Sequence, residues 1–422
     1  MGAAYLREVA WAYSLQPRGI RLELDRMRAA LRLFGSPERS LKVVHIAGTN
    51  GKGSVAAMIE RGLRENGLRT GLYTSPHLHS FTERVQIGGR LIARRDAARW
   101  LRAIRERLAA PDAPQLTFFE VATLLAFLAF RERGVEIVVL EVGLGGRLDA
   151  TNVVTRPLLT LITRIARDHE QYLGRTLAKI AGEKAGIMKR GVLCLSGVDQ
   201  PSARTAILRR AAEVGAEVEE IGRGIAARGA LDVTAFGRSF TGLAVPLSGA
   251  HQRRNAALAA AALLFLERRL GLDRAASQRG LEATRWPGRL ELVPGAPSVL
   301  LDAAHNPDGA RALAAYLTAR PAERRVLVFG AMRDKDWRVM HDALAPVVSS
   351  SIFCAPALGR AEAPEVLAEG RGRAASSVEA AVEAAREEAG PAGLVVVCGS
   401  IFVLAAARAH VLGIASDPPI AM

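Results

Sequence analysis

The sequence has few cysteines and no long apolar run. Its three cysteines are scattered, cannot all pair and lack the spacing of metal ligands, so neither a disulfide framework nor a zinc site is expected. The longest uncharged apolar run, 256–266, is shorter than the ~18 residues needed to cross a bilayer. Arg7 and Glu8 stand where a secretory signal needs an apolar core. These absences favour a cytoplasmic protein that does not enter a membrane.

Lysine is also scarce, because it accounts for only six of the 57 lysine and arginine residues. The formal net charge is +15, but the arginines are dispersed along helical faces, as over 94–107, which disfavours nucleic-acid binding. A polyanionic small substrate would be steered by the same positive field. Because the chain uses arginine for most of its positive charges, a lysine indicates that its position needs a primary amine. Three lysines fall in stretches with other functional signs: Lys52, Lys184 and Lys335.

Strands and helices alternate along most of the 422 residues, which is typical of α/β domains, and the length is too great for one ordinary core. We expect an N-terminal P-loop ATPase domain, 1–284, with a mostly parallel sheet and a small β appendage over 216–247. A Pro-Gly break in the stretch 283–289 marks the boundary. The remainder, 285–422, is expected to form a smaller Rossmann-like α/β domain. Its strands are predicted near 298–302, 325–330, 350–354 and 394–398.

A glycine-rich turn, 45–54, follows the apolar strand 41–44 and opens onto a predicted helix, 55–66. Successive glycines let backbone N–H groups converge on an anion, the helix N-terminus adds partial positive charge, and Lys52 supplies a full one. The spacing departs from the usual signature because only two residues separate Gly48 from Gly51 and Gly53 follows Lys52. An ordinary glycine turn is the alternative to a phosphate site.

Polar residues follow several other predicted strands. Strand 70–73 leads to the hydroxyls of Thr74 and Ser75, where open parallel sheets bind ligands. Strand 137–140 delivers Glu141, which suits a Mg²⁺ ligand because that ion usually takes one or two protein oxygens together with phosphates and water. The segment 141–149 is not a dinucleotide-binding turn, because Leu148 replaces the third glycine and no helix start follows. Strand 158–162 leads to Asp168-His169, for which a loop hydrogen bond is the alternative.

Six motifs in order resemble the folylpolyglutamate synthase and bifunctional dihydrofolate synthase family of the Mur ligase superfamily. The resemblance spans nearly the whole chain. The motifs are 48–54, 74–78, Glu141 with 143–152, 183–187, 286–289 and 302–307.

The resemblance implies ATP-dependent joining of L-glutamate to a folate carboxylate, and to dihydropteroate, through an acyl phosphate. ATP would be a co-substrate and two Mg²⁺ ions the cofactors, in a monomer with small-molecule partners. Two dianionic reactants need metals and cations to approach one another. It also implies that Lys184 is carbamylated. Only a neutral primary amine reacts with CO₂, so arginine could not substitute; an ordinary helix-surface lysine is the alternative.

The site residues that the resemblance implies fall into five groups. The ATP-binding set is Asn50, Gly51, Lys52, Gly53, Ser54, Asn255, Arg289 and Asp302. The metal ligands are Ser75, Glu141 and His169. The folate-binding set is Ser75, Pro76, His77, Phe119, Asp149, Ala150 and Thr151. The glutamate-binding set is Asp302, His305 and Ser400. The catalytic set is Lys52, Lys184, His169 and His305.

Two other functions stay open at this point. A cell-wall muramyl-peptide ligase of the same superfamily would share most motifs, and only 49–54 and 75–78 favour folate. A nucleotide-dependent binding module without ligase activity would retain or hydrolyse ATP with no dependence on an amino acid. The residues of the phosphate and metal sites precede 286 and the 302–307 turn follows it, so both domains are expected to contribute to activity.

Overall fold

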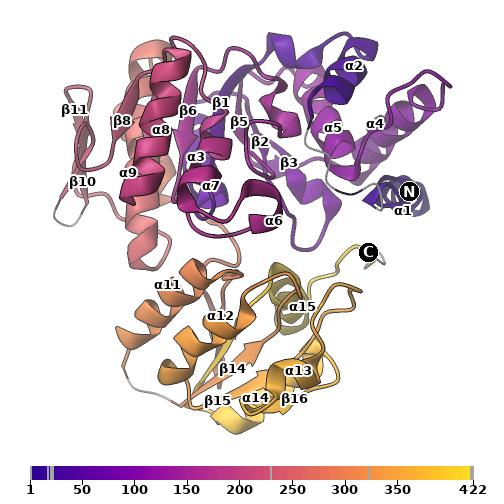
Figure 1. Cartoon of the computed structure of the whole chain (residues 1–422), viewed down its shortest axis with the longest axis vertical. Coiled ribbons are helices and arrows are strands. Elements are labelled where there is room, and N and C mark those ends of the chain that lie inside the picture. Colours follow the sequence, from indigo (N-terminus) through magenta and orange to yellow (C-terminus); the bar gives the residue numbers. More distant parts are fainter. Residues whose placement is uncertain (1, 17–18, 20–22, 229–230, 322–323, 419–422) are drawn as a thin grey trace. The chain divides into compact units, whose positions relative to one another are not determined.

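The computed structural model describes residues 2–16, 19, 23–228, 231–321 and 324–418 (Figure 1). The chain divides into two compact units, which are described separately. The first comprises residues 1–77, 81–246 and 252–285, and the second comprises 78–80, 247–251 and 286–422. Within the described residues, no helix is both long and apolar enough to span a membrane.

The first unit contains an eight-stranded sheet in the order β4-β3-β2-β5-β1-β6-β7-β8. The β2–β3 and β3–β4 pairs are antiparallel and the other pairs are parallel, so the predicted mostly parallel sheet is confirmed. The strands are β1 Lys42–Ala47, β2 Thr70–Tyr73, β3 Val85–Ile87, β4 Arg90–Leu91, β5 Ile137–Glu141, β6 Leu159–Ile162, β7 Cys194–Ser196 and β8 Val218–Glu220.

Uniform burial identifies the centre of this sheet. Every residue of β2, β5, β6 and β7 is buried, as is all of β1 except its first residue. Strands covered on both faces read as continuous apolar runs, which is why the sequence reveals them. In register, Ile46 lies opposite Glu141 and also opposite Leu161. The carboxyl ends of β1, β5 and β6 therefore share one edge of the sheet.

The helices of this unit follow the predicted pattern. Helix α5 begins with a capping box, in which the Thr117 hydroxyl accepts from the Glu120 N–H and the Glu120 carboxylate accepts from the Thr117 N–H. The helices are α1 Gly2–Tyr13, α2 Asp25–Leu33, α3 Lys52–Glu65, α4 Arg94–Arg107, α5 Phe118–Glu132, α6 Glu170–Leu173, α7 Leu177–Ala185, α8 Pro201–Val214, α9 Ala250–Leu270 and α10 Arg274–Glu282. Short 3₁₀ helices are η2 Pro37–Ser40, η3 Phe81–Arg84 and η4 Ala150–Val153.

The β appendage is smaller than predicted. Strands β9 (Ala226–Arg228), β10 (Asp232–Ala235) and β11 (Arg238–Phe240) form a separate antiparallel sheet, but β8 pairs in parallel with β7 at the edge of the main sheet. The prediction that all of 216–247 belongs to an appendage is therefore wrong. A three-residue strand has too little periodicity to reveal which sheet it joins.

The second unit contains a six-stranded sheet in the order β12-β13-β17-β14-β15-β16. Successive strand residues alternate between two cores: one is covered by α11 and α12 and the other by α14 and α15. The two edge strands, β12 and β16, were not predicted. The strands are β12 Glu291–Val293, β13 Ser298–Leu301, β14 Arg325–Phe329, β15 Ser350–Phe353, β16 Arg373–Ala374 and β17 Leu394–Cys398. The helices are α11 Pro307–Thr318, α12 Trp337–Leu344, α13 Pro364–Ala368, α14 Val378–Ala389 and α15 Ile401–Leu412, with the 3₁₀ helix η5 Ala345–Val347.

Candidate functional site

The predicted phosphate loop connects β1 to α3. Helix α3 begins at Lys52, three residues before the predicted start, because Gly51 adopts a left-handed conformation (φ 91°) and serves as its N-cap. Gly48 also has a positive φ, and a Cβ there would lie 1.8 Å from the Thr163 hydroxyl oxygen. A hydrogen bond also joins this loop to the segment after β6, because the Thr49 N–H donates to the Arg164 carbonyl at 2.8 Å. Strand, glycine turn and helix N-terminus therefore occur as the anion-binding geometry requires.

Several predicted nucleotide-binding residues lie together around this loop. The Lys52 ammonium donates to the Thr49 carbonyl at 3.1 Å, across the mouth of the turn. The Asn255 side chain lies so close to Gly51 that a Cβ there would be 2.5 Å from its amide oxygen. Asn255 Nδ2 donates to Gln252 Oε1 at 2.9 Å, and Gln252 Nε2 donates to the buried Ser54 hydroxyl at 3.3 Å. Helix α9 thus meets the start of α3, and Gln252 is a member of this group that the sequence did not suggest.

Glu141 and Ser75, two predicted metal ligands, are adjacent. Glu141 is the last residue of β5, is buried, and accepts a hydrogen bond at 3.1 Å from the Ser75 N–H on the loop after the neighbouring strand β2. Ser75 and His77 on that loop are partly buried, whereas Pro76 is exposed. A carboxylate and a hydroxyl are oxygen ligands that suit Mg²⁺.

His169, the third predicted metal ligand, lies at the start of α6 in a left-handed conformation (φ 51°). Its N–H donates to Asp168 Oδ1 at 2.9 Å, and its ring Nε2 lies 3.9 Å from the same oxygen. Among the described residues, no group of three His, Cys, Asp or Glu side chains could hold a metal ion. Magnesium needs few protein ligands, so the Glu141 and Ser75 oxygens fit it, while the role of His169 stays a prediction.

Lys184 is buried at the end of α7, so the alternative of an ordinary helix-surface lysine is wrong. Its ammonium donates to the Gly48 carbonyl of the phosphate loop at 2.9 Å, across 136 positions of sequence. Burial, reinforced by the charge of Lys52, lowers the pKa of Lys184 to about 7. A large neutral fraction near pH 7 is what a reaction with CO₂ requires.

The glycine-rich segment 143–149 packs directly on the end of α7. A Cβ on Gly146 would lie 2.9 Å from both the Glu183 and Lys184 carbonyl oxygens, and a Cβ on Gly186 would lie 2.3 Å from the Arg147 Cβ. The Arg147 N–H donates to the Glu183 carbonyl at 2.8 Å. These glycines therefore allow close backbone approach beside Lys184, which gives the glycine pattern a structural reason.

Asn152 fastens the same junction. Its amide donates to the carbonyls of Arg147 (2.9 Å) and Gly186 (3.1 Å), and its oxygen accepts from the Lys189 ammonium at 2.6 Å. One side chain thus joins the glycine segment to the turn that follows α7. The sequence analysis assigned no role to Lys189. The scarcity of lysine, with six in the chain, is the one feature of the sequence that could have indicated a role.

The predicted folate residues Asp149 and Thr151 bond to their own loop. Asp149 Oδ1 accepts from the Thr151 N–H (3.0 Å) and hydroxyl (2.6 Å), and Oδ2 accepts from the Leu144 N–H (2.8 Å). Asp149 thereby caps the 3₁₀ helix η4, which contains Ala150 and Thr151. Between β5 and β6 the described residues form no α-helix, as expected for a segment that is not a dinucleotide-binding turn. Burial raises the pKa of Asp149, while the donated hydrogen bonds oppose the shift. The Phe119 ring lies against Gly143, because a Cβ on Gly143 would be 2.3 Å from the ring.

His45, in the middle of β1, supports this network from inside the sheet. Its Nε2 lies 2.9 Å from the Thr151 hydroxyl oxygen, which uses its own proton to bond Asp149. His45 therefore donates through Nε2. Within the described part of the chain, the buried Nδ1 has no hydrogen-bond partner. Burial, together with the charge of Lys189, lowers the pKa of His45 to about 3.

In the second unit, Asp302 and Ser400 follow the adjacent parallel strands β13 and β17. Asp302 is buried; its carboxylate accepts from the Leu290 and Ala304 N–H groups, both at 2.9 Å. Burial raises the pKa of Asp302, and Arg289 is the leading charge that opposes the shift. Ser400 caps α15 by accepting from the Phe402 N–H at 3.2 Å.

His305 lies on the turn after β13. Its Nδ1 is 2.8 Å from the Ala303 carbonyl oxygen, so Nδ1 carries the proton and donates. The turn after β14, the strand on the other side of β17, carries Lys335. The helix after β13, α11, covers one face of the sheet, whereas the helix after β17, α15, covers the other. In open α/β sheets, ligands bind at the carboxyl ends of two neighbouring strands whose helices lie on opposite faces. The structure therefore places Asp302, Ser400 and Lys335 along one edge of this sheet.

Comparison with known proteins agrees with this geometry. Residues 46–263 match the profile of the Mur ligase middle domain, and residues 288–401 match that of the Mur ligase glutamate ligase domain. The folylpolyglutamate synthase of Lacticaseibacillus casei is 34% identical over 97% of this chain and 99% of its own length. The chain belongs to the folylpolyglutamate synthase family of Mur ligases.

Two further comparisons concern a longer relative and a solved structure. A probable bifunctional folylpolyglutamate synthase/dihydropteroate synthase of Haloferax volcanii is 35% identical over 96% of this chain, which spans only 50% of that relative. The structure of Mycobacterium tuberculosis folylpolyglutamate synthase complexed with ADP has a TM-score of 0.89 and 35% identity, covering 96% of this chain and 98% of that one. The family profiles begin at residue 46, so α1 and α2 lie outside them.

Proposed function

We propose that this chain is an ATP-dependent ligase that adds L-glutamate to folates and also to dihydropteroate. The observation that carries the proposal is the convergence on one phosphate loop of the Lys184 amine, the Lys52 ammonium and the Asn255 amide. Membership of the folylpolyglutamate synthase family supports it, as do the family structures with ADP and with Mn, AMPPNP and L-glutamate. The cytoplasmic location stays a prediction.

In the proposed reaction, the acceptor carboxylate attacks the γ-phosphorus of ATP, and ADP leaves. The glutamate amine then attacks the acyl phosphate, loses a proton and expels phosphate to form the amide. The N–H groups of the phosphate loop, with Lys52, would hold the transferred phosphate, and Gln252 would orient the Ser54 hydroxyl. Because both reactants are anions, the contribution of the protein is mainly positioning and charge stabilisation.

Two Mg²⁺ ions are part of the proposal. Glu141 and Ser75 would hold one, and Glu141 with His169 the second. The ions would neutralise phosphate charge and polarise the phosphoryl oxygens. Carbamylation of Lys184 would replace a cation beside the phosphate loop with an anion. Two observations support it: the pKa of Lys184 is lowered to about 7, and the Gly48 carbonyl holds the amine in one place.

The glutamate and acceptor sites are proposed as follows. Asp302, His305 and Ser400 would receive the glutamate; its two carboxylates also need a cation, and Lys335 supplies one at the same sheet edge. Ser75, Pro76, His77, Phe119, Asp149, Ala150 and Thr151 would bind the folate. The hydrogen bonds of Asp149 and Thr151 within their own loop support a fixed shape for this wall of the acceptor site.

One assay tests the function. Purified protein with ATP, Mg²⁺ and L-glutamate is supplied separately with dihydropteroate, tetrahydrofolate or a muramyl substrate, and both ADP release and amide formation are measured. We expect ADP to accumulate only when glutamate and a folate-type acceptor are both present. Turnover with the muramyl substrate alone would favour the cell-wall ligase, and ATP hydrolysis that ignores glutamate would favour the binding module.

A further inference from the structure

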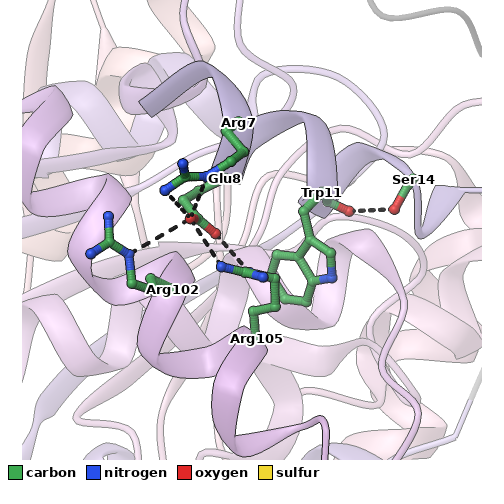
Figure 2. A network of polar contacts seen from close by, with 6 residues as sticks. All are labelled: Arg7, Glu8, Trp11, Ser14, Arg102 and Arg105. Atoms are coloured by element: carbon green, nitrogen blue, oxygen red, sulfur yellow. Dashed lines mark hydrogen bonds and ion pairs between the residues drawn. The ribbon is translucent and has the colours of Figure 1, made fainter. Parts of the chain in front are cut away.

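The N-terminal helix α1 is fixed to α4 by a completely buried carboxylate. Glu8 on α1 is 0% exposed and accepts from Arg105 on α4 through both oxygens, at 2.9 and 3.2 Å (Figure 2). Arg7 donates to the same carboxylate at 3.3 Å, and Arg102 Nε lies 3.7 Å away. Loss of one partner of a buried ion pair is costly, because the other charge is left without compensation. This contact therefore helps to hold α1 on α4, together with the buried side chains of Tyr5, Val9 and Ala12.

Tyr13, the last residue of α1, reaches the loop after β2. It lies five residues beyond Glu8, or about 7.5 Å along the helix at ~1.5 Å per residue. Its hydroxyl is 2.9 Å from His77 Nε2, and its ring stacks on Phe118 with centroids 4.7 Å apart and planes 13° apart. Helix α1 thus connects the Glu8 contact to the loop that contains Ser75 and His77.

Arg84 holds the other side of the His77 ring. Arg84 Nε donates to His77 Nδ1 at 2.9 Å, and an arginine nitrogen can only donate. Nδ1 is therefore the acceptor, and the ring proton resides on Nε2 and is donated to the Tyr13 oxygen. The two contacts together fix both the tautomer and the orientation of His77, while Phe118 is covered by Tyr13 and by the Arg84 guanidinium, 4.9 Å from the ring centroid.

We propose that Tyr13 is a positioning residue for the folate acceptor, which acts through His77 and is itself held by the contact of Glu8 with Arg105. The proposal rests on the proposed function, because His77 is assigned to the acceptor there. The phosphate loop follows a different strand, β1, so we expect Tyr13 to act on the acceptor and not on the nucleotide. Helix α1 lies outside the segments that match the Mur ligase profiles, whereas His77 and Arg105, which it contacts, lie inside the segment 46–263.

The first test is Tyr13→Phe, which removes the hydroxyl and keeps the stacked ring. We expect the KM for the folate acceptor to rise about three- to tenfold, the range for loss of one hydrogen bond, with kcat and the KM for ATP unchanged. Combined with His77→Gln, Tyr13→Phe should add little, since its effect passes through the histidine. An unchanged acceptor KM, an equal rise in the KM for ATP, or fully additive effects would each overturn the proposal.

The second test is Glu8→Gln, with Glu132→Gln as the matched control. Glu132 joins α4 to α5 by accepting from Arg99 and from Trp100, so it is also a carboxylate that fixes α4 to a neighbouring helix. Both variants should lower the melting temperature, but only Glu8→Gln should raise the acceptor KM. If the two variants change the acceptor KM equally, the effect is general loosening and Glu8 has no special part.

The proposed function is checked separately in the wild-type protein. Folate binding measured by calorimetry does not require turnover, so Tyr13→Phe can be compared with wild type by Kd as well as by KM. A wild type that binds folate without ligating glutamate would refute the proposed function and still decide the role of Tyr13. A wild type that does neither, or a variant with unchanged Kd, would refute the positioning role.

Discussion

Lys184 combines burial, a lowered pKa and contact with the phosphate loop, and these features yield a prediction at the scale of one residue. Lys184→Ala should lose on the order of a hundredfold or more in kcat, the usual cost of one positioned charged group. Short carboxylic acids should partly restore the rate, because they can place a carboxylate where the carbamate would be. The measurement is kcat against the concentration of added acetate or propionate.

The control for this prediction is on the same helix. Lys179 is exposed on α7, and Lys179→Ala should keep normal activity with no response to added acids. Since the pKa of Lys184 is about 7, its reactive neutral form increases as pH rises through that value. Labelled bicarbonate should accordingly be incorporated better at pH 8 than at pH 6. Absence of label in active protein would refute carbamylation.

His45 yields a second residue-scale prediction, which concerns stability. Burial lowers its pKa to about 3, whereas an unfolded histidine titrates near 6.5, so between these values the unfolded chain binds a proton that the folded chain does not. This contribution to stability is present above pH 6.5 and is lost as the pH falls. Over the 1.5 units from 6.5 to 5 the loss is about 2 kcal/mol at ~1.4 kcal/mol per unit.

His45→Gln tests this by comparison, because glutamine can still donate to the Thr151 hydroxyl but does not titrate. Urea unfolding at pH 7 and pH 5 should show that wild type loses about 2 kcal/mol more than the variant over this interval. Equal losses in the two proteins would mean that folding does not lower the pKa of His45.

At the scale of elements, the glycine segment 143–149 packs against helix α7 and so holds Lys184 in place. Gly186 has φ −59°, which alanine adopts readily, but an added Cβ would lie 2.3 Å from the Arg147 Cβ and 2.4 Å from its Cα. Overpacking of this kind costs about 1–3 kcal/mol. The melting temperature and kcat should both fall, because the displaced turn is two residues from Lys184.

Gly182 is the matched control in the same helix, since an added Cβ there meets nothing within 4 Å. Gly182→Ala should stabilise the protein by roughly 0.5–1 kcal/mol, the usual gain when alanine replaces glycine inside a helix. Differential scanning calorimetry of the two variants measures the contrast. Similar melting temperatures would show that the close approach of the glycine segment to α7 is not needed for stability.

The elements themselves were mostly predictable from the sequence, and the reasons are local. Continuous apolar runs identified β1, β5 and β6. Helix α3 was placed too late because apolar spacing cannot report a glycine N-cap. The edge strands β12 and β16 escaped because two or three residues, partly exposed, carry no periodicity.

The candidate site was predictable chiefly through its resemblance to a family. No periodicity in the chain could have joined Lys184 to Gly48 or Gln252 to Ser54, because these contacts span 136 and 198 positions. Asp149 is different: an aspartate two residues before Thr151 suggests a side chain that caps its own turn, and the structure has that bond. The roles assigned to individual site residues remain predictions.

At the scale of the whole molecule, the residues with proposed roles are divided between two units. Lys52, Glu141 and Lys184 belong to the first unit, whereas Asp302, His305 and Ser400 belong to the second. In the proposed function, ligation uses both groups of residues, whereas we expect nucleotide affinity to depend mainly on the first unit, which contains the phosphate loop and its helix N-terminus. Variants in the second unit should therefore separate ligation from nucleotide binding.

His305→Ala tests that separation. The proposed role of His305 is to place glutamate, so amide formation should fall on the order of a hundredfold or more, while the Kd for ADP, measured by calorimetry, should stay close to wild type. His410→Ala is the control: His410 is an exposed histidine on α15 of the same unit that contacts Glu383 on α14, and its loss should leave both quantities unchanged. Lys52→Ala should show the converse pattern, with loss of ADP affinity. If His305→Ala weakened ADP binding as much as it slowed ligation, the division of roles between the two units would be wrong.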